Sequence, residues 1–146
     1  MAIRSFAAED NNLSTSLISS RSKSYLDIDL SLSPKPAGDI YKKTDAAAVK
    51  QAVRNLLLTT RGEKPFNPFY GSNLNSALFG LDTDFDPDYI QDLVADAIEN
   101  FEPRARVLSV SIKLQSDYNA IDISVEFQVI STREIVNVDV SLQRLR

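Results

Sequence analysis

The residues with the most defined chemistry are an acid and a base that flank a proline, Glu102-Pro103-Arg104. Proline cannot occupy a helix interior, because it has no N–H and its ring clashes with the preceding turn. It also moves the residue before it, Glu102, out of the helical region. These residues predict a rigid corner that ends a helix near Phe101 and fixes two opposite charges. On residue types alone the corner is either an exposed, salt-bridged helix stop or a docking site for a partner's charged or backbone groups.

Catalysis in this chain would have to rely on carboxylates, lysine, tyrosine or serine, because the sequence has no histidine and no cysteine. Histidine is the commonest general base and a common metal ligand, and cysteine supplies thiolate nucleophiles and zinc sites. A glycosidase needs two carboxyl groups about 5–9.5 Å apart, one of them protonated. Arg104 favours the ionised form of Glu102, which is the wrong form for a general acid. We therefore expect no catalytic residue, no metal and no cofactor, and a carboxylate-based hydrolase is the alternative.

Length and charge indicate one acidic domain. The chain has 146 residues, a formal net charge of −4 and a pI of about 4.8. A nucleic-acid-binding surface normally shows a basic excess, so we expect no direct nucleic-acid partner. We also expect no membrane partner, because no apolar run approaches the roughly 20 residues of a membrane span. The first residues, Met1 to Phe6, lack the apolar core of a signal peptide.

Residues 1–23 are polar and rich in serine, and Leu13, Leu17 and Ile18 are the only apolar residues after Ala8. This composition predicts a flexible N-terminal arm followed by a single domain over residues 24–146. The alternative is an arm that becomes ordered on a neighbouring subunit.

Periodicity predicts the elements of that domain. Apolar and polar residues alternate from Tyr25 to Leu32, which is typical of a strand with one apolar and one wet face. Similar alternation over 107–114, 121–129 and 136–142, with short turns between, predicts an antiparallel meander. Apolar stripes after Thr44 and after Asp86-Pro87 predict two main helices, and Ser72 can cap a short one. The predicted fold is α+β, an antiparallel sheet of about four strands (the N-terminal strand plus the C-terminal meander) packed against these helices.

The loop between Gly62 and Ser72 carries three aromatic residues together with two prolines. Because exposed loops rarely hold so many aromatic side chains, we expect Phe66, Phe69 and Tyr70 to anchor the loop on the core.

The chain resembles the baseplate wedge, or sheath-initiator, proteins of contractile-tailed phages and their relatives in type VI secretion baseplates. Several motifs in one order carry the resemblance: Gly38-Asp39-Ile40, the run from Asn55 to Lys64, the run from Pro68 to Leu74, Leu78-Phe79, and Phe101-Glu102-Pro103-Arg104 before a strand hairpin. Together they cover about residues 25–143. Phe101 stands where the family frequently has an indole, and the N-terminal arm has no counterpart.

The resemblance implies a structural virion subunit of the inner tail baseplate, around the tail tube, assembled in the host cytoplasm. It implies that Glu102, Pro103 and Arg104 dock on the helical core bundle of the other wedge proteins. It also implies that the tail sheath subunit attaches through strand exchange. Two alternatives come from other classes: a lysozyme-like peptidoglycan hydrolase and a soluble regulatory binding module on the same fold.

An edge strand is the second predicted contact, since open sheet edges invite pairing with another chain. The last predicted strand carries few charges. Its proposed acceptor residues are Ile135, Val136, Asn137, Val138, Asp139 and Val140. The alternative is an edge blunted by the basic tail, Arg144 to Arg146.

Overall fold

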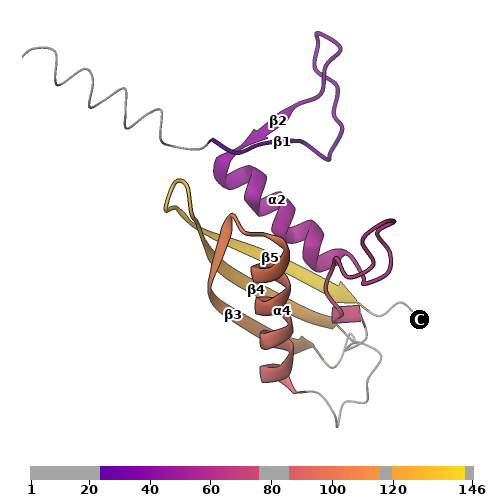
Figure 1. Cartoon of the computed structure of the whole chain (residues 1–146), viewed down its shortest axis with the longest axis vertical. Helices are drawn as coiled ribbons and strands as arrows, with labels where there is room; N and C mark the ends of the chain where they lie inside the picture. The colour runs from indigo at the N-terminus through magenta and orange to yellow at the C-terminus, as the bar shows by residue number, and fades with distance from the viewer. Residues whose placement is uncertain (1–23, 76–85, 116–119, 144–146) are drawn as a thin grey trace, which may run out of the picture.

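The computed structural model describes residues 24–75, 86–115 and 120–143, which form an α+β fold (Figure 1). Its elements in chain order are β1 (Leu26–Ile28), β2 (Lys42–Thr44), α2 (Asp45–Leu58), α4 (Pro87–Phe101), β3 (Ala105–Gln115), β4 (Ala120–Val129) and β5 (Ile135–Gln143). The predicted fold class is confirmed. Of the predicted short helix, Leu74 and Asn75 are helical. The rest of it lies outside the described residues, as does the predicted arm over 1–23.

The C-terminal meander forms a three-stranded antiparallel sheet in the order β3-β4-β5, as its alternation predicts. One face is apolar and buried, and both helices pack against that face, α4 along β3 and α2 along β5 (Figure 1). β4 lies in the middle of the sheet and supplies the most completely buried side chains of the core: Ile121, Ile123, Val125, Phe127 and Val129. The opposite face is polar.

Helix α4 begins and ends where its sequence predicts. The Asp86 carboxylate accepts a hydrogen bond from the Asp88 N–H at 3.0 Å, and Pro87 occupies the first helical turn. Its apolar stripe is buried against the sheet. The helix ends at Phe101, two residues before Pro103, so α4 delivers the chain directly into the corner.

The N-terminal strand forms but does not join the meander. β1 pairs with β2 as a separate two-stranded antiparallel hairpin at the N-terminal end of α2 (Figure 1). The alternation places four apolar side chains on one face, but β1 ends at Ile28 and the chain turns between Asp29 and Leu32. All four are 57–60% exposed: Leu26, Ile28, Leu30 and Leu32. The expected burial of that face is therefore wrong. Asp27, on the opposite face, turns toward the body instead, because Arg104 after α4 binds its carboxylate.

Two further apolar predictions are also wrong. The alternation over 107–114 predicts that Leu108 and Val110 share the buried face of a strand. A β-bulge between Val107 and Ser109 shifts the register of β3 instead, and Leu108 is 48% exposed. In the loop after α2, Phe66 is fully exposed and Phe69 is 76% exposed. Tyr70 alone anchors the loop as expected.

Candidate functional site

The corner after α4 is rigid because its backbone is hydrogen-bonded on both sides of Pro103. The Glu102 N–H donates to the Ile98 carbonyl at 2.8 Å, and the Glu102 carbonyl accepts from the Ala105 N–H at 3.0 Å. Glu102 is buried, with 7% of its surface exposed, whereas Pro103 is exposed and Arg104 is half-buried. The corner therefore presents its proline and part of its arginine to solvent.

The charges of the corner are engaged within the chain. Arg104 Nε donates to Glu102 Oε1 at 2.6 Å and Nη2 donates to Glu102 Oε2 at 2.9 Å, which is a bidentate pair. Nη1 donates to Asp27 Oδ2 on β1 at 3.0 Å, and the guanidinium lies 5.5 Å from the centre of the Tyr25 ring. The hydrogen bonds to Glu102, followed by the one to Asp27, raise the pKa of Arg104 above its ordinary value. We call the Glu102–Arg104–Asp27 set the corner clamp.

Asp27 and Tyr25 are the site residues that sequence reasoning missed. Asp27 lies on β1 and Tyr25 directly precedes it, and both are less exposed than the apolar residues that alternate with them. The alternation was a usable signal that this face differs from the other. It did not show which group, 77 residues away, would bind it.

The hairpin is further tied to α2 through Gln51 and Asp45. Gln51 Nε2 donates to the Ile28 carbonyl at 2.8 Å, and Gln51 Oε1 accepts from the Leu30 N–H at 3.3 Å. The Asp45 carboxylate accepts from the Tyr25 N–H at 3.0 Å. The bonds of Gln51 and Asp45 hold the backbone of the hairpin on α2, and the corner clamp holds the Asp27 side chain, opposite Leu26 and Ile28.

Tyr70 connects the aromatic loop to the corner. Its ring meets Phe101 edge-on, with centroids 5.5 Å apart, and Lys64 Nζ lies 3.9 Å from the centre of the same ring. Burial, followed by the negative charge of Glu102, raises the pKa of the Tyr70 phenol.

The predicted acceptor strand is an edge of the sheet within the described residues, where β5 pairs with β4 alone. The Val129 N–H donates to the Glu134 carbonyl at 2.9 Å at the start of the ladder. Because bonded and non-bonded pairs alternate along an antiparallel ladder, Val136, Val138 and Val140 bond to β4. Ile135, Asn137 and Asp139 then direct their N–H and C=O groups to the open edge.

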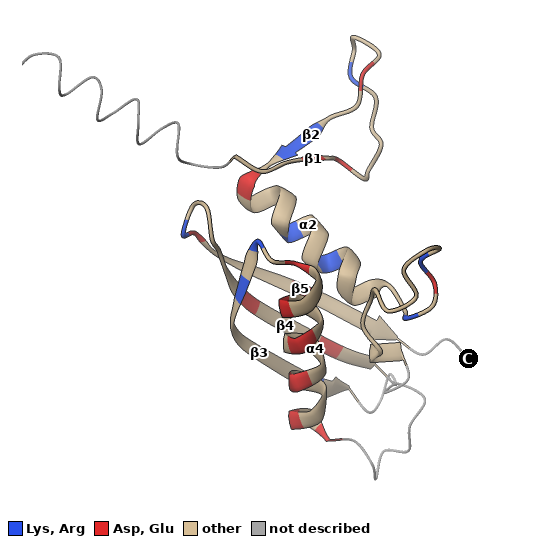
Figure 2. Cartoon of the chain, viewed as in Figure 1, with Lys and Arg blue, Asp and Glu red and all other residues tan. Residues whose placement is uncertain are grey.

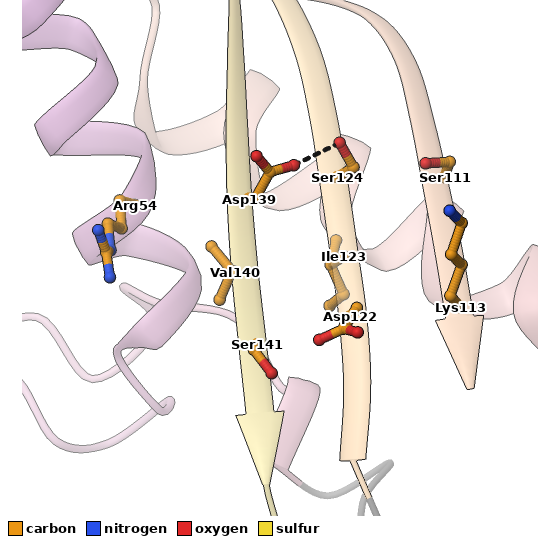
Figure 3. Close-up of a pocket in the computed structure, with 9 residues that line it drawn as sticks. All are labelled: Arg54, Ser111, Lys113, Asp122, Ile123, Ser124, Asp139, Val140 and Ser141. Atoms are coloured by element: carbon orange, nitrogen blue, oxygen red, sulfur yellow. Dashed lines mark hydrogen bonds between the residues drawn. The ribbon is translucent and has the colours of Figure 1, made fainter. Parts of the chain in front are cut away.

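The polar face of the sheet is hollowed by a cavity of about 540 Å³ beside α2 (Figure 3). Its lining residues are Arg54, Ser111, Lys113, Asp122, Ile123, Ser124, Asp139, Val140 and Ser141. The Ser124 hydroxyl donates to Asp139 Oδ1 at 2.7 Å. A catalytic triad would also need a base between the hydroxyl and the carboxylate, and the described lining of the cavity has no histidine for that role. Over the described ranges no three potential ligands gather around a possible metal ion. No helix in the described part of the chain has the length and hydropathy to cross a membrane.

Acidic side chains gather on the outward face of α4, while the basic residues are dispersed over the described parts of the molecule (Figure 2). The acids of this face are Asp88, Asp92, Asp96 and Glu99.

Comparison with known proteins gives one consistent result. The family model described as baseplate wedge protein gp25 matches residues 43–134, more than half of the chain. Baseplate wedge protein gp25 of Enterobacteria phage T4 is 29% identical over 109 residues, which cover 74% of this chain and 82% of that protein.

Two solved structures share the fold. The crystal structure of a putative tail lysozyme from Geobacter sulfurreducens superposes with a TM-score of 0.59 at 24% identity, over 67% of this chain and 89% of that one. A chain of the anti-feeding prophage baseplate, determined by cryo-EM with 6-fold symmetrisation, gives 0.58 at 18% identity, over 84% and 88%. Because the family model matches more than half of the chain, the chain belongs to the baseplate wedge protein gp25 family.

Proposed function

We propose that this protein is a non-catalytic subunit of the inner baseplate, around the tail tube, that joins the wedge to the sheath of a contractile tail. In this proposal the subunit is assembled in the host cytoplasm and remains in the tail baseplate of the virion. The corner docks on the helical core bundle of other wedge proteins, and the open edge of β5 receives a strand of the sheath subunit.

The observation that supports docking most directly is the corner clamp. A docking surface binds more tightly when its geometry is fixed before binding, because less conformational entropy is lost. The bidentate pair holds Arg104 against Glu102, and the backbone bonds around Pro103 hold the turn. Pro103 and the exposed part of Arg104 therefore form a preorganised surface beside the hairpin.

The test compares Arg104→Ala with Asp27→Ala in tail particles that lack the native subunit. Both variants cut the tie to the hairpin, but only Arg104→Ala alters the surface of the corner. We expect Arg104→Ala to lose stability, because the buried Glu102 carboxylate loses its charged partner, but to remain folded by circular dichroism. It should reduce assembled baseplates by at least about tenfold, one decade corresponding to about 1.4 kcal/mol. Asp27→Ala should reduce them less. Normal tails from Arg104→Ala would contradict docking at the corner.

A peptidoglycan hydrolase remains the competing function, because the Geobacter sulfurreducens relative is described as a putative tail lysozyme. Against it, both oxygens of Glu102 accept hydrogen bonds from Arg104 and the residue is only 7% exposed, so its carboxyl group is engaged within the chain and is not presented to a substrate. A turbidity assay on peptidoglycan distinguishes the two functions. Lysis that disappears in Glu102→Gln would overturn the structural assignment, and we expect no lysis by the unaltered chain.

A further inference from the structure

A basic side chain of α2 lies beside the open edge of β5. Arg54 lines the cavity on the sheet together with Asp139, Val140 and Ser141 of β5, although it belongs to the helix that packs on the opposite face. Figure 3 shows Arg54 on α2 beyond β5, on the side away from β4. The helix therefore gives the open edge a positively charged flank.

Lys50 extends this basic flank by one turn of the helix. Residues four apart lie on the same side of a helix, about 6 Å from each other along its axis. Lys50 and Arg54 are both exposed, and within the described ranges neither side chain has an ion-pair or hydrogen-bond partner. The one acid of α2 is Asp45 in its first turn, where it accepts a hydrogen bond from the Tyr25 N–H (Figure 2). The two charges of the basic flank are therefore uncompensated in the described part of the chain.

The pleat of the sheet decides which residues of an added strand would meet the basic flank. Side chains alternate between the two faces along a strand, and Asp139, whose backbone points to the open edge, has its side chain on the polar face with Ser124. Residues of an added strand that pair with Val138 and Val140 would therefore lie on the helix face. Two such residues are about 6.6 Å apart, which matches the roughly 6 Å between the two bases of α2.

We propose that the strand received at the open edge of β5 carries two acidic residues, two positions apart, on the side that faces α2. This inference rests on the proposed function, in which β5 receives a strand of the sheath subunit, and it adds the chemistry that selects the strand. Backbone hydrogen bonds give affinity for any extended segment, whereas side chains at alternate positions decide which segment binds. Arg54 and Lys50 are the specificity-determining residues of the edge.

The basic flank also acts against other occupants of the edge. A second copy of β5 has no acid on the helix face, since its one acid, Asp139, lies on the polar face. Antiparallel pairing of two copies would also bring their basic flanks onto one face, and like charges at facing positions are destabilising. The last residues of the chain, Arg144 to Arg146, have the same sign as the flank. An acidic strand is the occupant that the charge of the edge favours.

The test reverses both charges in particles that lack the native subunit, and it counts sheathed tails by electron microscopy. Lys50→Glu/Arg54→Glu should form normal baseplates but at least about tenfold fewer sheathed tails, because two attractive pairs become repulsive. Lys50→Arg/Arg54→Lys keeps both charges and should retain sheath formation. Lys42→Glu/Arg61→Glu makes the same change in net charge at two exposed positions outside α2, and it should behave like the unaltered chain.

Salt dependence separates charge recognition from a change of shape. Unsheathed particles with each variant are mixed with purified sheath subunit at about 0.1 M and about 1 M salt, between which the Debye length falls from about 10 Å to about 3 Å. The deficit of Lys50→Glu/Arg54→Glu relative to the unaltered chain should shrink at high salt. A deficit that is the same at both salt concentrations would overturn recognition by charge. Circular dichroism of each variant confirms the fold, and because both bases are exposed the melting temperature should change little.

Asn137→Pro separates this inference from the proposed function, because it removes a backbone donor at the same edge and leaves both bases in place. Normal sheathing by Lys50→Glu/Arg54→Glu, with loss of sheathing in Asn137→Pro, would overturn the acidic strand and leave strand addition standing. Normal sheathing by both variants would overturn both ideas. Sheathing lost only in the charge variant would also overturn the inference, since the bases would then act without a strand at the edge.

Discussion

At Arg104 one guanidinium joins segments that lie 77 residues apart in the chain. Its bidentate bonds to Glu102 stabilise a buried carboxylate that would otherwise lack a partner for its charge. Its third bond reaches Asp27 and fixes the hairpin. The same side chain thus supports the turn and orients a neighbouring element.

Ionisation of Tyr70 should make the stability of the protein depend on alkaline pH. Burial and the charge of Glu102 raise the pKa of its phenol, so the folded protein holds this proton more tightly than the unfolded chain does. The corresponding stability is complete below the unfolded pKa of about 10 and is lost as pH rises through the folded pKa. We expect Tyr70→Phe to make the alkaline loss of unfolding free energy shallower. Urea unfolding across this pH range measures the effect. Tyr89→Phe is the control, because the Tyr89 side chain lies on the exposed side of α4.

Gly71 allows a second prediction at the scale of one residue. Its φ is +112°, and a Cβ there would lie 2.5 Å from the Thr59 carbonyl oxygen. Gly71→Ala should cost about 3 kcal/mol or more, since strain and a backbone collision add. Gly62→Ala is the matched control, because its φ is +88° but the space around it is open, and it should cost only about 1 kcal/mol. Thermal unfolding of both variants measures the loss of stability. Equal losses in Gly71→Ala and Gly62→Ala would contradict a collision with the Thr59 carbonyl.

At the scale of elements, local patterns predict what local forces decide. The cap, the proline and the apolar stripe of α4 fix its ends, and strict alternation fixes the three strands of the meander. The strand at Leu26–Ile28 was also predicted, but its partner and its exposed face were not. Period two shows that two faces differ, and tertiary contacts decide which one turns inward.

The same limit explains the two other misplaced sets of apolar side chains. A bulge of one residue moves Leu108 to the outside, and no local signal in β3 marks it. Burial of the loop aromatics was predicted because aromatic side chains are usually buried. In the structure the loop is closed by its own hydrogen bonds, and Phe66 and Phe69 are exposed. Glu102, Pro103 and Arg104 were found from sequence, but their contact with Asp27 depends on the folded arrangement.

The open edge of β5 gives the prediction for this scale. Asn137 directs its N–H to that edge, so Asn137→Pro removes one donor that a sheath strand would use. Asn137→Ala keeps the donor and removes the same side-chain contact with Ser124, which makes it the matched control. We expect both variants to fold and to form baseplates. Asn137→Pro should give at least about tenfold fewer sheathed tails than Asn137→Ala, and a factor of ten corresponds to about 1.4 kcal/mol. Equal sheath formation, counted by electron microscopy, would contradict strand addition at β5.

Among the described residues, the buried core belongs almost entirely to the segments after residue 45. The buried cluster begins at Val49 and includes residues of both helices and of every strand of the meander, while the hairpin adds only the half-buried Tyr25. The family match likewise begins at residue 43. The hairpin is therefore an attachment to a complete core, whereas β5 contributes Val138, Val140 and Leu142 to that core.

Because the hairpin lies outside the core and β5 lies within it, removal of the hairpin and removal of β5 should have opposite effects on folding. A chain of residues 43–146 should fold and unfold cooperatively, because it retains the buried cluster and the Glu102–Arg104 pair. Removal of residues 135–146 should prevent folding, because three buried aliphatic side chains and the partner strand of β4 are lost together. Loss of one large buried aliphatic side chain costs about 2–5 kcal/mol, and the whole free energy of unfolding of a domain is only about 5–15 kcal/mol. Near-ultraviolet circular dichroism and urea unfolding report the outcome. A folded chain without β5 would show that the core is smaller than the buried cluster indicates, and it would make that truncation a direct test of the sheath contact.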